Sequence, residues 1–208
     1  MIVIIDYGVG NLRSVQNMLK KAGSETVISN EIETISKADR LVLPGVGRFD
    51  HGMKKLHENG LVEPLSEIVL HGRKPILGIC LGSQILGNGS EEGDAKGLGW
   101  IDMYCQRFEA TEGFRVPHMM WNNLEIKKTC PLIENYAADS QYYFVHSYYM
   151  NCKNEEDVVA VTNYNVAFTS VVQRKNIIGM QFHPEKSLRF GLKIMRQFCE
   201  WEPHENHK

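Results

Sequence analysis

The pentapeptide Gly78-Ile79-Cys80-Leu81-Gly82 follows directly on the apolar run Pro75-Ile76-Leu77. A strand that turns sharply into a helix needs residues without a Cβ atom on both sides of the strained position. The serine version of this pattern raises a nucleophile above the strand ends of an α/β sheet and offers the following backbone N–H to an oxyanion. The sequence therefore predicts a nucleophile elbow at Cys80. A buried structural cysteine in a glycine-rich turn is the alternative.

A second motif, Gln181-Phe182-His183-Pro184-Glu185-Lys186, follows about a hundred residues later. A free thiol is only a few per cent ionised at neutral pH, so a cysteine nucleophile needs an imidazole beside it and a third group to orient that imidazole. If residues 177–182 form a strand, His183 leaves its end, and Pro184 stiffens the turn so that His183 and Glu185 can converge. Beside the elbow, this pattern indicates a catalytic pair and not a surface turn.

The apolar pattern predicts the architecture. Short continuous apolar runs alternate with amphipathic segments in the first half, which favours a parallel sheet covered on both faces. The predicted strands there are 2–5, 40–43 and 76–79, and the predicted helices are 11–22 and 53–71, the latter broken at Glu63-Pro64. Between 101 and 180 the β-rich runs 141–149, 158–162 and 167–172 indicate an antiparallel extension, and 188–198 has the spacing of a closing helix.

Composition excludes several classes of protein. With 208 residues, 43% of them hydrophobic, the chain is expected to form a single domain, residues 1–208. A formal net charge of −2, with no cluster of four or more Lys/Arg, argues against nucleic-acid binding. The sequence has no apolar run long enough for a membrane span and no basic leader before its first strand. Five widely spaced cysteines favour a reducing compartment, so we expect a cytoplasmic protein.

Two glycine motifs and the C-terminal residues complete the pattern. Pro44-Gly45-Val46-Gly47 follows a predicted strand and would let a backbone N–H approach a reacting carbonyl, although a plain tight turn is the alternative. Gly8-Val9-Gly10 fails the dinucleotide fingerprint, because Arg13 stands where the third glycine belongs. The final His204-Glu205-Asn206-His207 is interpreted as a polar tail. We expect neither a metal site nor a cofactor.

The elbow, the His183-Pro184-Glu185 motif and the opening Asp6-Tyr7-Gly8-Val9-Gly10-Asn11 together resemble class I (triad) glutamine amidotransferases. The resemblance covers nearly the whole chain and is closest to the glutaminase subunits of imidazole glycerol phosphate synthases. It implies a flavodoxin-like open mixed sheet, mostly parallel with an antiparallel extension and with helices on both faces. It also implies that Cys80 is the nucleophile, His183 the general base and acid, and Glu185 the residue that orients His183.

The resemblance assigns further roles. Gly47 and Leu81 would donate to the oxyanion. Gln84, one helical turn after Cys80, and Glu92 would bind glutamine, together with backbone groups of His146, Ser147 and Tyr148. Asn11, Trp121 and Lys186 would face a partner. That partner would be a (β/α)8-barrel cyclase in a heterodimer, which receives ammonia through an internal tunnel and makes imidazole glycerol phosphate and AICAR in histidine biosynthesis.

Three departures from the family pattern leave the acceptor open. Met120 replaces the usual glycine in Pro117-His118-Met119-Met120-Trp121-Asn122, Ser83 replaces a methionine, and Gly87-Asn88-Gly89 should shorten or loosen the elbow helix. A paralogous glutaminase that serves a different synthase, for example one that modifies a surface sugar, is therefore the second hypothesis. A cysteine hydrolase or peptidase, and a non-enzymatic binding module, are the remaining alternatives.

Overall fold

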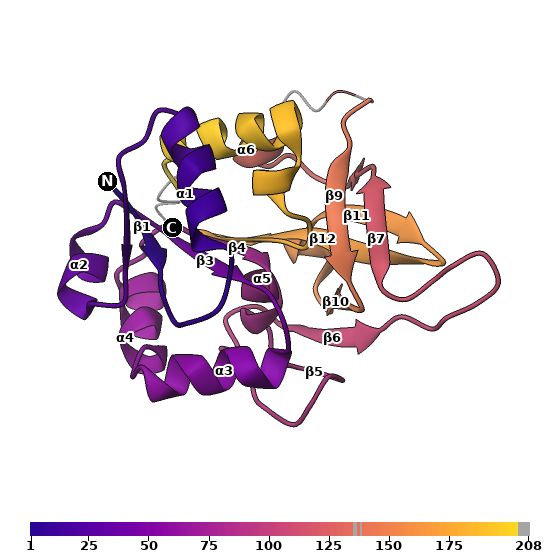
Figure 1. Ribbon diagram of the computed structural model, residues 1–208, viewed down its shortest axis with the longest axis horizontal. Helices are drawn as coiled ribbons and strands as arrows, with labels where there is room; N and C mark the ends of the chain where they lie inside the picture. The colour runs from indigo at the N-terminus through magenta and orange to yellow at the C-terminus, as the bar shows by residue number, and fades with distance from the viewer. Residues whose placement is uncertain (135–136, 138, 204–208) are drawn as a thin grey trace.

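The computed structural model describes residues 1–134, 137 and 139–203, so the C-terminal residues 204–208, which include the predicted polar tail, lie outside the described residues. Its main sheet has the strand order β2-β1-β3-β4-β13-β12-β10-β6-β5 (Figure 1). The strands from β2 to β13 in this order are parallel, and they are β1 (Ile2–Ile5), β2 (Thr26–Ser29), β3 (Arg40–Gly45), β4 (Ile76–Cys80) and β13 (Ile177–Met180). The predicted parallel core is confirmed.

Helices cover both faces of these parallel strands. Successive side chains of a strand point to opposite faces, and β1 shows this directly. Ile2 and Ile4 join a core beneath α1 (Leu12–Lys21) and α6 (Leu188–Glu200), whereas Val3 and Ile5 join a second core beneath the helices of the other face. Those helices are α2 (Ile32–Lys37), α3 (Phe49–Glu58), α4 (Val62–Ser66) and α5 (Leu81–Ile85). Figure 1 shows α1 and α6 along one side of the sheet and α3 and α4 along the other.

The helical segment after β3 breaks earlier than expected. The predicted second helix start at Glu63-Pro64 is confirmed to within one residue, but the break precedes it: α3 ends at Glu58, and Gly60, with φ +62°, turns the chain before α4 begins at Val62. Pro64 lies in the first turn of α4, where a missing N–H removes no helical hydrogen bond. A π-helical turn at Glu67–His71 follows α4 and leads into β4.

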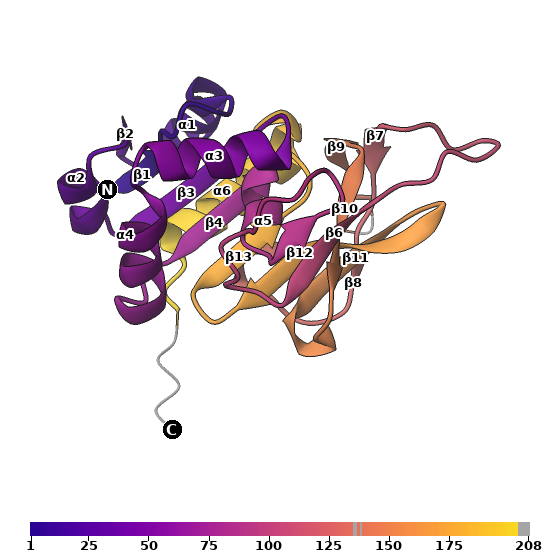
Figure 2. The same ribbon diagram turned by 90° about the horizontal axis from the view of Figure 1, so that it is seen from below.

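The antiparallel half extends away from the parallel strands, as Figure 2 shows. It contains β6 (Met103–Arg107), β7 (His118–Asn122), β8 (Glu125–Ile126), β9 (Tyr142–His146), β10 (Tyr148–Cys152), β11 (Val158–Tyr164) and β12 (Val166–Arg174). The short edge strand β5 (Gly89–Ser90) pairs with β6 in parallel. The predicted β-rich run 141–149 is confirmed and forms two strands, β9 and the start of β10. The chain changes partners at Ser147: β9 pairs with β7 in a small separate sheet, and β10 pairs with β12 and β6 in the main sheet.

The elbow helix α5 is only five residues long and ends at Ile85, before Gly87. Within the part of the chain that the structure describes, no helix combines the length and apolar character needed to cross a membrane.

Candidate active site

Cys80 ends β4 and directly precedes α5, in the strained conformation that the sequence predicts. Its φ is +54°, an unusual value for a residue with a side chain. Both flanking glycines are required by close contacts. A Cβ atom on Gly82 would lie 1.8 Å from the Leu43 carbonyl oxygen, and one on Gly78 would lie 2.8 Å from the Gly82 carbonyl oxygen. The turn therefore presses the start of α5 against β3 and holds Cys80 at the end of the parallel strands, 7% exposed.

His183 and Glu185 converge beside this cysteine. The Glu185 Oε1 atom lies 2.7 Å from Nδ1 of His183, and both side chains are 2% exposed. Burial lowers the pKa of His183, but the neighbouring Cys80 thiolate and the Glu185 carboxylate more than offset this and raise the pKa to about 10. The Nε2 atom of His183 is buried and has no nitrogen or oxygen hydrogen-bond partner. The arrangement can therefore hold a thiolate beside an imidazolium whose far nitrogen is oriented by a carboxylate.

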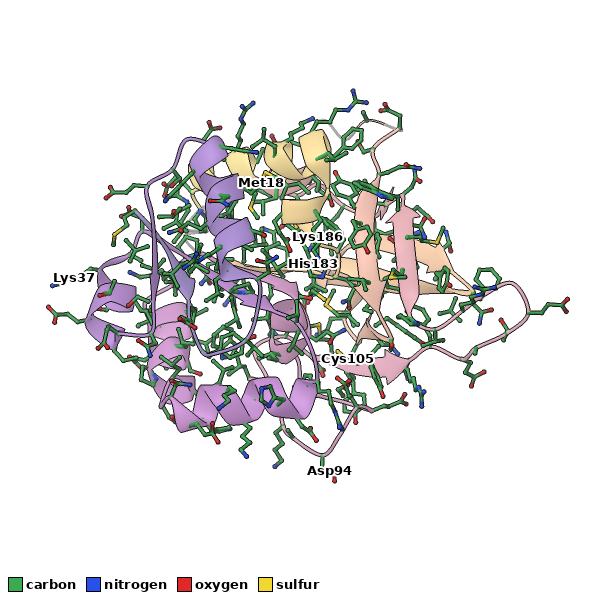
Figure 3. The ribbon with its side chains drawn as sticks, viewed as in Figure 1. Met18, Lys37, Asp94, Cys105, His183 and Lys186 are labelled. Carbon is green, nitrogen blue, oxygen red and sulfur yellow. The ribbon has the colours of Figure 1, made fainter. Side chains whose placement is uncertain are left out.

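The turn Pro184–Lys186 positions this pair. It lies between β13 and α6, where Ser187 Oγ donates to the His183 carbonyl and the His183 N–H donates to the Tyr143 carbonyl. Figure 3 shows His183 and Lys186 at the start of the segment that leads into α6. One backbone hydrogen bond to β9 and one from the Ser187 hydroxyl thus hold the main chain at His183 before any substrate arrives.

The strand β3 brings the predicted oxyanion segment to the elbow. Gly45 is paired with Cys80 in the sheet, and a Cβ atom there would lie 2.6 Å from the Tyr7 hydroxyl. That hydroxyl donates to the Pro44 carbonyl at 2.8 Å, which anchors the segment just before it leaves the sheet. Gly47 has φ +99° and open space where a Cβ would lie. Donation by the Gly47 and Leu81 N–H groups to an oxyanion remains a prediction.

Gln84 and Gln181 form a hydrogen-bonded pair beneath the sulfur. The Gln84 Nε2 donates to the Tyr148 carbonyl at 2.8 Å and to the Gln181 Oε1 at 3.1 Å, so contact with a substrate would use its Oε1 as acceptor. The Gln181 Nε2 lies 3.9 Å from Cys80 Sγ. Sequence reasoning assigned no role to Gln181. Its place two residues before His183 at a strand end, on the same side of the chain, is the signal that could have found it.

Glu92 is held at the start of α3. Its Oε2 accepts from the Phe49 N–H at 2.7 Å, and the Arg48 guanidinium donates to its carbonyl oxygen at 3.4 Å. A carboxylate at the N-terminus of a helix satisfies a backbone donor that has no partner within the helix. This contact joins positions 43 residues apart and gives Glu92 a structural role. Binding of the ammonium group of glutamine by the other oxygen of Glu92 stays a prediction.

The predicted backbone ligands His146, Ser147 and Tyr148 lie where β9 passes into β10. The Ser147 carbonyl accepts from the Phe108 N–H, and the Tyr148 carbonyl accepts from Gln84. This crossover is therefore hydrogen-bonded to the elbow helix one turn after Cys80. No group of three or more His, Cys, Asp or Glu side chains able to hold a metal ion occurs among the residues that the structure describes.

The residues predicted to meet a partner divide into two groups. Trp121 and Lys186 contact the same ring: Trp121 packs edge-on against Tyr143 at 5.9 Å, and the Lys186 ammonium lies 5.6 Å from the Tyr143 ring centre. Three consecutive residues of β7 are exposed: Met119 by 62%, Met120 by 45% and Trp121 by 37%. We call Met119, Met120, Trp121 and Lys186 the β7 face. Asn11 is exposed and caps α1 through its Oδ1, which accepts from the Ser14 N–H.

Acid should destabilise the fold through two buried histidines. Burial lowers the pKa of His118 to about 4 and that of His146 to about 3, from 6.5. Above pH 6.5 neither state is protonated at these rings; below it the unfolded chain binds protons that the native chain does not, so stability is lost as the pH falls. We expect the free energy of unfolding to drop by about 3 to 5 kcal/mol between about pH 6.5 and 4.5.

Urea unfolding at a series of pH values measures this loss directly. The slope of the unfolding free energy against pH should correspond to an uptake of about two protons on unfolding. Replacing the exposed His71 with glutamine serves as the control and should leave the slope unchanged. A flat profile down to about pH 5 would contradict the assignment of these two rings as neutral in the native state.

Known proteins resemble this chain over nearly its whole length. The model of the family "Glutamine amidotransferase class-I" matches residues 3–200. A Pseudomonas aeruginosa protein named imidazole glycerol phosphate synthase subunit HisH 2 is 50% identical over 96% of this chain and 99% of its own length. A Bdellovibrio bacteriovorus protein named imidazole glycerol phosphate synthase subunit HisH is 38% identical over 96% of this chain and 100% of its own length. A crystal structure entitled glutamine amidotransferase, 20% identical, has a TM-score of 0.72 and covers 96% of this chain and 98% of that chain, which supports the fold.

Proposed function

This chain belongs to the class-I glutamine amidotransferase family, and we propose that it is the glutaminase subunit of an imidazole glycerol phosphate synthase in histidine biosynthesis. It hydrolyses glutamine to glutamate and ammonia. The identity of 50% to a HisH subunit, over nearly the full length of both chains, is the observation that carries the pathway assignment.

The reaction divides into two steps at the elbow. The Cys80 thiolate attacks the side-chain amide carbon of glutamine, and the C–N bond breaks as the His183 imidazolium gives its proton to the leaving ammonia. His183 then takes a proton from water, which attacks the thioester, breaks the C–S bond and releases glutamate. Glu185 keeps the imidazole oriented through both steps. The backbone N–H groups of Gly47 and Leu81 stabilise the oxyanion of each tetrahedral intermediate.

Recognition of glutamine uses the groups around the elbow. Gln84 presents its Oε1, because both hydrogens of its Nε2 are engaged. Glu92 offers its second carboxylate oxygen to the α-ammonium group, and backbone groups of His146, Ser147 and Tyr148 complete the set. The single domain, residues 1–208, thus supplies the whole glutaminase site.

Ammonia is useful to an acceptor only before it becomes ammonium, so the subunit docks on its synthase. The partner is a (β/α)8-barrel cyclase in a heterodimer, which meets the β7 face and Asn11 and whose bound nucleotide activates the glutaminase. All five cysteines are free, which fits a reducing compartment such as the cytoplasm.

The test is glutamate formation by the purified chain. With glutamine alone we expect slow hydrolysis, and with the barrel cyclase of the same organism and its nucleotide substrate a much faster one. No response to the cyclase would overturn the pathway assignment. Equal hydrolysis of peptides would favour a cysteine peptidase, and absence of any hydrolysis would favour a binding module.

Replacing Trp121 with alanine should weaken binding of the cyclase by at least about 30-fold, because an aromatic side chain half exposed in the free subunit is a typical anchor of an interface. Isothermal titration calorimetry with the cyclase measures the change in Kd. Tyr104→Ala is the matched control, since Tyr104 is 45% exposed on β6, outside the β7 face. Equal losses in the two variants would show that Trp121 is not an anchor.

A second candidate acceptor is favoured by one feature of the β7 face. Met120 stands there in place of the usual glycine and is 45% exposed, between Met119 and Trp121. The more similar of the two relatives also carries the numeral 2 in its name. A paralogous glutaminase for a different synthase would show tight binding to that synthase and none to the cyclase.

A further inference from the structure

Two buried histidines outside the candidate triad face each other across the β7–β9 pair. His118 and His146 are register partners, 0% and 6% exposed, and their rings are joined by a 3.1 Å contact between His118 Nδ1 and His146 Nε2. His146 Nδ1 lies 2.8 Å from the Tyr148 carbonyl oxygen, and His118 Nε2 lies 3.4 Å from the Asn122 amide nitrogen. The four residues form one continuous chain of hydrogen bonds.

The Tyr148 carbonyl fixes the direction of every hydrogen bond in this network. A carbonyl oxygen only accepts, so His146 must carry its proton on Nδ1 and donate to Tyr148. In a neutral ring Nε2 of His146 is then an acceptor, which requires the proton of His118 to lie on Nδ1 as well. His118 Nε2 is in turn an acceptor, and Asn122 donates to it. The network thus assigns the same tautomer to both rings.

The Tyr148 carbonyl is shared with the candidate active site. It also accepts from the Gln84 Nε2, whose second hydrogen goes to Gln181, and Gln181 reaches Cys80 Sγ. The histidine chain and the glutamine pair therefore meet at one oxygen atom. If the proton of His146 moved from Nδ1 to Nε2, a lone pair of Nδ1 would face that oxygen, and the oxygen would lose one of its two donors.

The surroundings keep both rings uncharged. His118 is stacked between Tyr164 and Phe144, with ring centres 4.0 and 4.9 Å away, and Phe108 and Phe168 pack against both imidazoles. Burial lowers the pKa of both histidines, and the charge of His183 adds to the effect on His146. At neutral pH each ring is therefore a neutral group with one donor and one acceptor.

We propose that His118 and His146 are positioning residues, whose neutral Nδ1–H tautomers orient the Tyr148 carbonyl and through it the Gln84 side chain that receives glutamine. The proposal rests on the proposed function for its substrate. It also connects β7, in which Met119, Met120 and Trp121 are exposed, to the glutamine site by a path of hydrogen bonds.

Nitrogen-15 NMR of the histidine rings in the full chain tests the tautomers. Between about pH 8 and pH 6, both rings should show a protonated Nδ1 and an unprotonated Nε2. His118→Phe and His146→Phe variants assign the signals. An Nε2–H tautomer, or a charged ring, at either position near neutral pH would overturn the proposal.

Kinetics of glutamine hydrolysis in the complex test the positioning role. His118→Phe keeps an aromatic ring but cannot donate to His146, and we expect KM for glutamine to rise about fivefold or more with a smaller change in kcat. His118→Asn should restore most of the loss, because its amide nitrogen can take the place of Nδ1. Tyr164→Phe is the matched control: it keeps the ring stacked on His118 and loses only a hydrogen bond to the Arg115 carbonyl.

The outcomes separate the two proposals. An unchanged KM in His118→Phe, or an equal rise in Tyr164→Phe, overturns the positioning role while the glutaminase assignment stands. If the unaltered complex does not hydrolyse glutamine, the proposed function fails and the role in glutamine binding fails with it.

Discussion

Cys80→Ser should lower the rate of glutamine hydrolysis by at least about 10³-fold in the complex with the cyclase. The site pairs a sulfur with an imidazole whose pKa is raised to about 10 by Cys80 and Glu185 against the opposing effect of burial. That pair stabilises a thiolate, and a serine hydroxyl is far harder to ionise, so the first step would lose its nucleophile. Glutamate release measured by a coupled assay gives the change.

The control for this variant is Cys152→Ser, at the end of β10, where the half-buried sulfur lies near the Asp102 and Asn154 carbonyls. It should keep nearly full activity. When ammonium salts replace glutamine, Cys80→Ser should also still support the acceptor reaction of the synthase, because that reaction needs only ammonia. Glutamine hydrolysis by Cys80→Ser at a rate near that of the unaltered chain would contradict the assignment of the nucleophile.

Gly82→Ala should lower the free energy of unfolding by about 3 kcal/mol or more, although alanine is the better helix former and Gly82 lies within α5. The added Cβ would lie 1.8 Å from the Leu43 carbonyl oxygen and 2.8 Å from the Leu43 carbonyl carbon. Both atoms belong to the backbone of β3, so the clash cannot be relieved by rotation of a side chain. Either α5 or β3 must move, and the elbow would move away from the oxyanion segment.

Urea unfolding measures this effect, with Gly23→Ala as the matched control. Gly23 has φ +96°, but no atom lies within 4 Å of the place a Cβ would take. Its replacement should therefore cost only the backbone strain, about 1 to 2 kcal/mol. A loss in Gly82→Ala no greater than in Gly23→Ala would show that the close approach of α5 to β3 is not required.

Local signals predicted the parallel half of the fold and the elbow. The runs at Ile2–Ile5 and Ile76–Cys80 are continuous and apolar because both sides of each strand are buried. This pattern can be recognised without knowledge of the partner strands. The two glycines around Cys80 are likewise a local signal, since the contacts that exclude a Cβ at Gly78 and Gly82 arise within the turn and the adjacent strand.

Features that depend on distant partners were not predictable in this way. Nothing in the β-rich run 141–149 indicates that the chain changes sheets at Ser147, because residues on both sides of this point have strand propensity. The contact of Glu92 with the start of α3 joins positions 43 residues apart. The shared acceptor at Tyr148 is evident only when α5 is placed against the junction of β9 and β10.

Alkylation by a glutamine-analogue electrophile, followed by mass spectrometry of each cysteine, tests most directly whether His183 and Glu185 activate Cys80. Cys80 should be modified at least about 100-fold faster than the half-buried Cys152 and Cys199, and glutamine should protect it. His183→Ala should remove this advantage. Similar rates at the three cysteines, or modification of Cys80 that glutamine does not slow, would contradict the account.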